Sequence, residues 1–306
     1  MKLRIIAFSL MLAGLLSTSC LKEDNSDCYN TYKLVLSYLG DGDTEIFSQK
    51  IGRVEMYVFD ASDACISSGV LSQENLASRT VILPPMEPGD YRIVCVGNTY
   101  DTEVENLSSK DYSNILFAAK AYKEGKTVTG NDSLYYASVE KTILPFDATI
   151  YEDVQTVSFV SSHYDVLVEV INAPDYVGNH PKIELVGVTP QTDFNNVAKG
   201  DPTDYVLETV HDGKKTTTAM SNIMRHENHE DVYLRVTGED GEQVAMINFE
   251  EHIEAYKDLI DTSKNECLIP FCIRFGTVDY PIEDGECLDV TITLPEWFVE
   301  NVTPEF

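Results

Sequence analysis

The chain has 306 residues, of which 51 are acidic and 22 basic, so its formal net charge is −29. This charge argues against nucleic acid as a partner, because phosphate must be neutralised by Lys and Arg, and it also argues against flat adsorption on anionic lipid. The length suggests one large or two ordinary domains, and a hydrophobic fraction of 43% is sufficient for a buried core.

The N-terminus has the pattern of a bacterial lipoprotein signal. Lys2 and Arg4 precede an apolar run over 5–16, which has the length of a secretory signal and is too short to span a bilayer. Small residues then lead to Cys20, and we expect cleavage before Cys20 and acylation of its thiol and new amine. Such signals usually have Leu three residues before the Cys, whereas Leu16 lies four before it. The alternative is an ordinary signal peptide with a chance Cys.

Alternating apolar and polar residues dominate the first half of the chain after a polar, acidic tether. A period of two is typical of half-buried strands, and Gly-Asp and Pro-Gly pairs between the runs mark turns. The predicted strands cover 32–38, 45–49, 53–60, 80–83 and 90–98, followed by short helical pieces within 107–122 and an extended region from 134.

A second series of strands begins near residue 157. Its predicted members are 163–171, 183–188, 205–210, 216–220, 232–237, 244–249, 268–275 and 288–294. Residues 250–260 instead have the spacing of a helix, with Ile253, Tyr256, Leu259 and Ile260 on one face. Many short strands with few helices indicate β-sandwiches, and the restart indicates two of them.

The sequence therefore predicts an all-β protein with two sandwich domains in tandem. The predicted division is a signal peptide over 1–19, a lipidated tether over 20–30, an N-terminal domain over 31–155 and a C-terminal domain over 156–306.

Seven cysteines include the proposed lipid anchor. In an oxidising compartment the others are able to form disulfides, but the sequence does not choose their pairing. Some, such as Cys95 and Cys272, lie in apolar strand-like runs and are equally well explained as buried thiols. The remaining cysteines are Cys28, Cys65, Cys95, Cys267, Cys272 and Cys287.

A fixed order of short motifs follows the lipoprotein signal, and this order resembles one known family. That family is the fimbrillin-associated anchor lipoproteins of Gram-negative anaerobes that assemble type V fimbriae. The resemblance is clearest over 20–100 and extends to 290–297, which resembles the closing strand of the family and its Trp. The motifs are Asp27-Cys28, Tyr32-x-Leu34-x-Leu36-x-Tyr38, the strand 54–60, the turn 83–88, Gly89-Asp90-Tyr91 and the strand 94–98.

The resemblance implies two transthyretin-like Greek-key β-sandwiches with short helices in the connections, no catalysis and no cofactor. Members of this family tether a fimbria to the outer membrane and limit its length. The implied partners are fimbrial stalk subunits and the outer membrane, through lipid at Cys20, with no small-molecule substrate. The segment 22–24, Lys-Glu-Asp, resembles the acidic signal that sends lipoproteins of these bacteria to the cell surface. An acidic solvated linker is the alternative.

The resemblance also suggests how the polymer ends. Stalk subunits of such fimbriae lose an N-terminal strand by proteolysis after a basic residue, and a strand of a neighbour fills the groove. The mature chain has no Arg before Arg53, which leads into a predicted core strand, although Lys22 and Lys33 remain as basic sites. We hypothesise that this chain stays uncut and ends the polymer.

The last predicted strand alternates as a donated strand would, and its apolar positions are candidate contacts with a neighbouring subunit. The alternative is an ordinary strand of its own domain. These positions are Leu288, Val290, Ile292 and Leu294.

No catalytic or metal motif emerges from the sequence. His226 and His229 are three residues apart and do not form the H-E-x-x-H motif of metalloproteases. The segment 60–63 lacks the Gly and the terminal Glu of a calcium loop, and a turn explains it better. Ser162-His163 near Asp165 is only a local cluster, because a triad is defined by its geometry in space. We therefore predict neither an enzyme nor a metal site.

Two features keep a glycan connection open. Ser133, in Asp132-Ser133-Leu134, resembles the O-glycosylation motif of this bacterial group. The 17 Tyr residues, against one Trp, would suit stacking on sugar rings, although Tyr is also common in β-sandwich cores. The alternative function is therefore a surface glycan-binding lipoprotein, which would bind a polysaccharide by itself rather than co-purify with fimbrial subunits.

Overall fold

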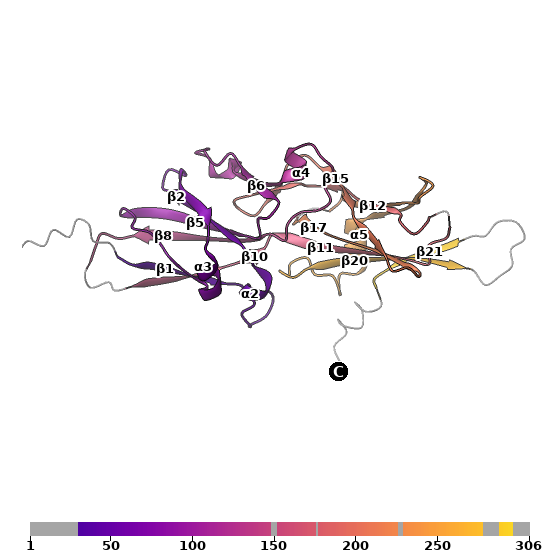
Figure 1. The fold of residues 1–306 in the computed structure, drawn as a ribbon, viewed down its shortest axis with the longest axis horizontal. Coiled ribbons are helices and arrows are strands. Elements are labelled where there is room, and N and C mark those ends of the chain that lie inside the picture. The colour runs from indigo at the N-terminus through magenta and orange to yellow at the C-terminus, as the bar shows by residue number, and fades with distance from the viewer. Residues whose placement is uncertain (1–29, 148–151, 176, 226–228, 278–287, 296–306) are drawn as a thin grey trace, which may run out of the picture.

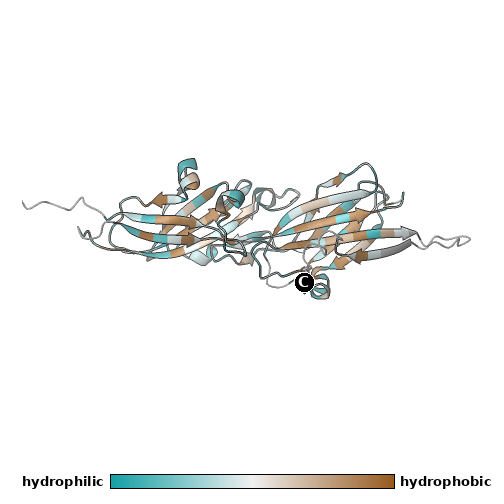
Figure 2. Cartoon of the chain, turned by 90° about the horizontal axis from the view of Figure 1, so that it is seen from below, coloured by the Kyte–Doolittle hydropathy of each residue, from teal (hydrophilic) through white to brown (hydrophobic). Residues whose placement is uncertain are grey.

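The computed structural model describes residues 30–147, 152–175, 177–225, 229–277 and 288–295, and these residues form an elongated all-β molecule (Figure 1). Two β-sandwiches follow each other along the long axis. Figure 2 shows hydrophobic and hydrophilic residues alternating along the strands of both. The predicted fold class is confirmed. Within the described ranges, no helix combines the length and the apolar character that crossing a membrane would need.

The N-terminal sandwich packs a sheet of three strands against a sheet of five. Its core includes Leu34 and Leu36 on one sheet and Val58 and Ile93 on the other. The smaller sheet has the order β4 (Thr80–Ile82), β1 (Tyr32–Ser37) and β9 (Asp153–Ser158). The larger has the order β10 (Val160–Ser161), β8 (Tyr135–Ile143), β5 (Gly89–Gly97), β2 (Val54–Asp60) and β3 (Cys65–Val70).

The C-terminal sandwich packs a sheet of five strands against a sheet of four. Its core contains Val166 and Val168 from one sheet and Leu185 and Leu234 from the other. The first sheet has the order β16 (Thr209–His211), β17 (Thr216–Met224), β11 (His163–Ile171), β20 (Leu268–Thr277) and β21 (Leu288–Thr293). The second has the order β15 (Thr203–Leu207), β12 (Lys182–Val188), β18 (Tyr233–Thr237) and β19 (Gln243–Asn248).

Short helices connect the strands, as expected. The helix predicted over 250–260 is present and ends at Ala255. The strand predicted over 45–49 is wrong, because the Glu45 carboxylate accepts the N–H groups of Tyr38 and Phe47 at 2.9 and 3.0 Å and closes a turn into a helix. The helices are α2 (Phe47–Lys50), α3 (Gln73–Ser78), η1 (Tyr112–Asn114), α4 (Lys120–Lys123) and α5 (Phe249–Ala255).

A third sheet joins the two halves of the chain. It has the order β14 (Ala198–Lys199), β13 (Gln191–Asp193), β7 (Leu116–Ala119) and β6 (Thr102–Glu105). Its central pair is antiparallel, with Thr192 of the second half opposite Phe117 of the first. Strand β7 therefore lies where the sequence predicted only short helical pieces, and those pieces are confined to η1 and α4 beside it.

This third sheet buries the second face of the large N-terminal sheet. Tyr57, Val58 and Phe59 are consecutive residues of β2 and all three are buried, which an ordinary two-layer sandwich would not require. Val58 faces the N-terminal core, whereas Tyr57 and Phe59 pack on Phe117 and Phe194 of the connecting region. The N-terminal half therefore has three layers, and the second half of the chain supplies part of the outer one.

Phe194 is the centre of this contact. Its ring stacks on Phe117 at a centroid distance of 4.6 Å and meets Tyr57 at 5.1 Å. Its carbonyl oxygen accepts the hydroxyl groups of Tyr112 and Tyr136, each at 2.6 Å. One residue of the second half is thereby enclosed by aromatic residues of the first.

Residues of the first half of the chain likewise enter the core of the C-terminal sandwich. Ala119 and Val128 belong to the first half of the chain but are buried in the core of the C-terminal sandwich. The N–H of Val206 donates to the carbonyl oxygen of Val128 at 2.8 Å, and Val128 forms a parallel bridge with Tyr205. Each sandwich is thus completed by residues from the other half.

The strand pairing also bears on the predicted domain division. Strand β9 pairs with β1 and β10 pairs with β8, so both belong with the N-terminal sandwich. The C-terminal sheets begin with β11 at His163. By pairing, the chain passes between the sandwiches at Ser162, whereas the predicted boundary at 155 falls inside β9. The division into two domains stays a prediction, because the third sheet belongs to both.

We expect Phe194→Ala to destabilise the whole protein by about 3–5 kcal/mol, because it removes a fully buried aromatic ring from a packed cluster. Urea unfolding followed by tryptophan and tyrosine fluorescence measures this loss. Val197→Ala, an exposed position in the β13–β14 hairpin, is the matched control and should change stability by less than about 0.5 kcal/mol. Equal effects of the two substitutions would contradict the central packing role of Phe194 in this contact.

Candidate functional site

The candidate site is the junction between the two sandwiches, where residues distant in the sequence meet. On one side the turn at Gly40-Asp41 contacts Asn265 and Glu266. Both carboxylate oxygens of Asp41 accept backbone N–H groups, from Asn265 at 2.8 Å and from Glu266 at 2.9 Å. The Asn265 side chain donates to the carbonyl oxygen of Gly40 at 3.1 Å and accepts the N–H of Ser161 at 3.0 Å. The loop at 265–266 is therefore bonded to two segments of the N-terminal sandwich, the turn at 40–41 and Ser161.

Glu266 is the charged centre of this contact. Its carboxylate accepts bonds from the Tyr38 hydroxyl and the Lys50 ammonium group, and Tyr135 lies 3.4 Å away. Burial by itself would raise the pKa of Glu266, but the bonds from Lys50 and Tyr38 outweigh it and hold the pKa below its usual value. Burial and the Glu266 carboxylate in turn raise the pKa of Tyr38, which stays protonated. The second half of the chain thus places the Glu266 carboxylate among hydroxyl and ammonium groups of the first half.

His163 lies beside this cluster and is a structural residue. It is buried, and its Nδ1 atom lies 2.9 Å from the carbonyl oxygen of Leu134. Its Nε2 atom lies 3.6 Å from a carboxylate oxygen of Asp165. Burial lowers the pKa of His163, which favours the neutral ring. The local cluster predicted around Ser162 therefore connects β11 to the first half of the chain.

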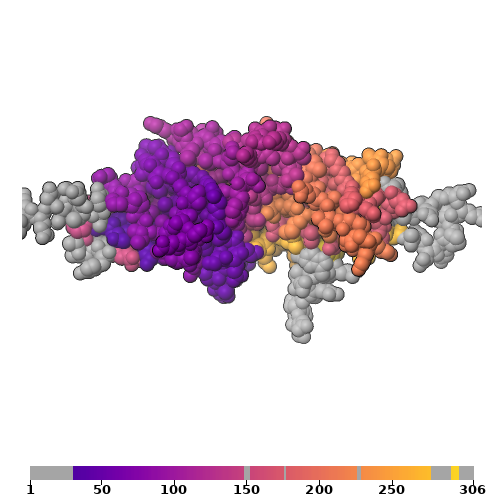
Figure 3. Space-filling view, viewed as in Figure 1, coloured from indigo at the N-terminus to yellow at the C-terminus, as the bar shows by residue number. Residues whose placement is uncertain are grey.

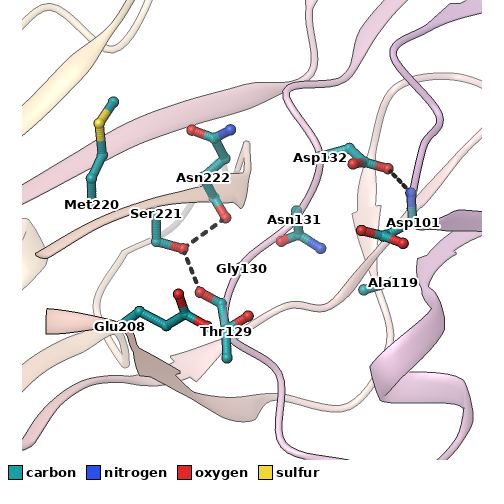
Figure 4. Close-up of a pocket in the computed structure, with 10 residues that line it drawn as sticks. All are labelled: Asp101, Ala119, Thr129, Gly130, Asn131, Asp132, Glu208, Met220, Ser221 and Asn222. Carbon is teal, nitrogen blue, oxygen red and sulfur yellow. Dashed lines mark hydrogen bonds between the residues drawn. The ribbon is translucent and has the colours of Figure 1, made fainter.

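On the other side of the junction the surface has a hollow of about 470 Å³ (Figure 4). The first half contributes Asp101, Ala119 and the segment 129–132, and the second half contributes Glu208 and the segment 220–222. The two segments are joined by the N–H of Asn131, which donates to the carbonyl oxygen of Asn222 at 2.9 Å. In Figure 3 the two halves form one continuous surface across the junction.

Ser133, the predicted glycosylation site, lies at the edge of this hollow. It is half-buried, and its hydroxyl oxygen accepts the side-chain amide of Asn222 at 2.6 Å. Its carbonyl oxygen accepts the amide of Asn98 at 3.2 Å. A sugar on the Ser133 oxygen would have to fit beside the Asn222 side chain that donates to this oxygen. Glycosylation of Ser133 stays a prediction.

The predicted donor strand is β21, at the edge of the large C-terminal sheet. It pairs antiparallel with β20, and the register places Thr293 opposite Cys272 and Ile292 opposite Ile273. Leu294 is buried in the C-terminal core, whereas Ile292 is partly exposed. Leu288 and Val290 lie on the same strand. Within this chain β21 therefore occupies the position of an ordinary edge strand.

The lipidation site at Cys20 lies outside the described residues, as do Cys28 and Cys287. Cys95 and Cys267 are buried thiols, and burial raises the pKa of each to about 12, so both stay protonated. Cys65 is a half-buried thiol in β3, and Cys272 is buried in β20. The disulfide pairing of the chain stays open.

The remaining motifs are explained by local structure where the structure describes them. The Asp60 carboxylate accepts the N–H groups of Ser62 and Ala64 at 2.8 and 3.2 Å and closes the turn between β2 and β3. His226 lies outside the described residues. Among those that are described, no group of three or more His, Cys, Asp or Glu side chains is placed to hold a metal ion.

Two interlocked β-sandwiches with a densely bonded junction define an all-β protein of the tandem-sandwich class. The model of the Fimbrillin-A associated anchor proteins Mfa1 and Mfa2 matches residues 25–303, and the chain belongs to this family. The family indicates a non-catalytic protein that is associated with fimbriae at the cell surface. No curated protein sequence matches the chain.

Solved structures share this fold at low sequence identity. The fimbrial anchor protein Mfa2 of Porphyromonas gingivalis is 17% identical, with a TM-score of 0.66, and the match covers 87% of this chain and 97% of that one. A candidate adhesin of Bacteroides ovatus is 14% identical, with a TM-score of 0.68 and coverage of 88% and 94%. A Bacteroides thetaiotaomicron protein named as a polysaccharide-binding candidate is 12% identical, with a TM-score of 0.64 and coverage of 87% and 98%.

We expect Glu266→Gln to lower stability at pH 7 by about 1–3 kcal/mol, because it weakens charged hydrogen bonds across the junction. The depressed pKa of Glu266 means that its contribution is present above about pH 4.5 and is lost as the pH falls through the folded-state value. The difference from the parent protein should therefore shrink below about pH 4.5.

Urea unfolding of both proteins at a series of pH values measures this difference. Glu74→Gln, at an exposed position in α3, is the control and should change stability at pH 7 by less than about 0.5 kcal/mol. A difference that is constant from pH 3 to pH 7 would contradict the role of the Glu266 charge.

Proposed function

We propose that this protein anchors a fimbria to the outer membrane through lipid at Cys20 and ends its polymerisation, and so supports adhesion. The family membership and the lipoprotein signal before Cys20 support the anchor. The acidic segment 22–24 supports display on the outer surface. The partners in this proposal are fimbrial stalk subunits.

The observation that carries the proposal is the position of β1. This strand is the centre of its sheet, antiparallel to β4 and parallel to β9, and Leu34 and Leu36 on it are fully buried. While β1 stays in place, the groove that it fills is closed to a strand from a neighbour. A subunit that keeps its first strand therefore accepts no further subunit at this position, which ends the polymer.

Two of the candidate basic sites, Lys33 and Arg53, are held by the fold, which supports an uncut chain at these positions, while Lys22 lies outside the described residues. The Arg53 guanidinium pairs with Glu55 at 2.7 Å and donates to the hydroxyl of Thr99 at 3.3 Å. Lys33 lies within β1 itself, and its ammonium group is 3.7 Å from Glu152. Cleavage after either residue would require local opening of the N-terminal sandwich.

We expect Cys20→Ala to release the protein and its attached fimbriae into the medium, because the substitution removes the only acylation site of the proposed signal. Immunoblots of cells and medium, with electron microscopy of the cell surface, measure the release. Cys65→Ala, a half-buried thiol in β3, is the control and should leave the protein on the cells. Retention of Cys20→Ala at the surface would contradict lipid anchoring.

A pull-down of the tagged native protein, extracted from membranes, identifies the partner. The proteins bound to it are determined by mass spectrometry. Recovery of secreted sandwich subunits in a ladder of sizes supports the anchor. Recovery of outer-membrane transport proteins, or of no protein, contradicts it.

Strand β21 is the proposed contact with the stalk, and donation would require it to leave β20. Thr293→Cys tests this directly, because the register places that position opposite the thiol of Cys272. If β21 is donated, we expect the oxidised variant to lose its fimbrial partner and to regain it after reduction with dithiothreitol. Co-purification under both conditions measures this. Equal recovery of the partner in both states means that β21 is an ordinary edge strand.

A further inference from the structure

Two histidines that are distant in the sequence lie side by side in the C-terminal sandwich. His211 is the last residue of β16, and His180 lies in the loop that leads into β12. The centroids of their rings are 6.0 Å apart, and the ring planes are inclined by 70°. Strands β12 and β16 belong to different sheets, so the tertiary structure alone brings the two imidazoles together.

The hydrogen bonds around His211 determine which of its ring nitrogens carries the proton. The Thr217 hydroxyl lies 2.7 Å from the carbonyl oxygen of Asn179, and because a carbonyl oxygen only accepts, the hydroxyl hydrogen is directed to it. The Nδ1 atom of His211 lies 2.9 Å from the same hydroxyl oxygen and is therefore the donor of that bond. In the neutral ring the proton is thus on Nδ1, and Nε2 keeps its lone pair. Thr217 is 1% exposed, so solvent does not compete for these bonds.

The backbone on both sides of His180 is fixed, so its ring extends from a defined position. The carbonyl oxygen of Asn179 accepts the Thr217 hydroxyl, and the N–H of His180 donates to the Glu239 carboxylate at 2.8 Å. The N–H of Glu239 in turn donates to the carbonyl oxygen of Val177 at 3.0 Å. The His180 ring itself is exposed and forms no hydrogen bond within the described part of the chain. Its nitrogens are therefore accessible to a ligand, and the ring is free to rotate.

This arrangement has the chemistry of a site for a divalent late transition metal. Imidazole nitrogens bind Zn²⁺, Cu²⁺ and Ni²⁺, and a ligating His usually donates its other ring N–H to an acceptor, as His211 does to Thr217. Zn–N bonds of about 2.0–2.1 Å place two ring centroids about 5 Å apart when both rings bind one ion at a tetrahedral angle. Rotation of the exposed His180 side chain covers the remaining difference of about 1 Å from the observed 6.0 Å.

The charge of the protein also favours a cation at this position. The Glu239 carboxylate lies against the backbone of His180, and the chain has a formal net charge of −29. An anion held by protonated imidazoles would be repelled by both. Hard cations such as Mg²⁺ and Ca²⁺ prefer oxygen ligands, so the two nitrogens favour the late transition metals.

We propose that His180 and His211 form a binding site for one divalent late transition metal ion, with Nε2 of His211 and a ring nitrogen of His180 as its two protein ligands. Water fills the other coordination positions in the isolated protein. Thr217 is a positioning residue, because it acts through Nδ1 of His211 and does not touch the metal. The site does not depend on the proposed anchor function, and β16 and β21 are opposite edges of their sheet.

Isothermal titration calorimetry of the purified, full-length mature protein without a polyhistidine tag tests the site. Zn²⁺, Cu²⁺ and Ni²⁺ are titrated separately, and Mg²⁺ serves as a probe for binding by carboxylates alone. We expect one saturable site per molecule for Cu²⁺ and Zn²⁺, tighter for Cu²⁺, and no such site for Mg²⁺. No saturable site for any of the three transition metals, or equally tight binding of Mg²⁺, would overturn the proposal.

Two substitutions locate the metal. His180→Ala removes one ligand, and His211→Asn removes Nε2 while it keeps an N–H donor for Thr217. We expect each to weaken metal binding at least about tenfold, with an unchanged thermal unfolding profile of the metal-free protein for the exposed His180→Ala. The control is His226→Gln, which removes an imidazole outside the described residues and should bind as the parent does. Full binding by His180→Ala and His211→Asn, or loss of binding only in His226→Gln, would show that the metal binds elsewhere and overturn the assignment.

The role of Thr217 and the ligand atoms are tested separately. Thr217→Val removes the hydroxyl that orients His211, and we expect it to weaken metal binding about 10–100-fold, with recovery in Thr217→Ser. Electron paramagnetic resonance of the Cu²⁺-bound parent should show coupling to two imidazole nitrogens, and His180→Ala should show coupling to one. A spectrum without nitrogen coupling would mean that carboxylates hold the ion and would also overturn the proposal.

Discussion

The antiparallel pairing of β7 with β13 is the interaction on which the rest of the structure depends. It brings Phe194 of the second half onto the large N-terminal sheet, where Phe117 and Tyr57 enclose it. It also directs the chain after β7 across the C-terminal sandwich, where Val128 enters the core. Because each half of the chain contributes apolar residues to the hydrophobic core of the other half, neither sandwich has a complete core by itself.

This exchange suits a protein that carries load between a membrane and a polymer. A flexible linker between two independent domains would absorb tension, whereas here a shared sheet, the Glu266 cluster and the Asp41 bonds connect the halves. The proposed lipid site at Cys20 precedes the N-terminal half, and β21 lies at the edge of the C-terminal half. In the proposed anchor, force from the stalk would therefore pass through the junction.

The same junction creates the hollow. The segment 129–132 crosses from one sandwich to the other, and strand β16 covers only part of β17, so the edge of β17 near Met220 is left open. Polar side chains converge there because the crossing segment cannot pair completely with either sheet. A structural requirement of the interlocked fold thus produces a polar hollow at the junction.

The sequence by itself determined the local structure and the family. Alternation predicted most strands, because burial on one face of a sheet repeats every two residues, and the ordered motifs after Cys20 indicated the family that the match over 25–303 shows. It failed at 45–49, where Glu45 closes a turn through its side chain, and at β7, whose partner is distant in the sequence. The third sheet, the Asp41–Glu266 contacts and the polar hollow at the junction were decided only by the tertiary structure. Each depends on residues far apart along the chain, whose contacts leave no periodic pattern in the sequence.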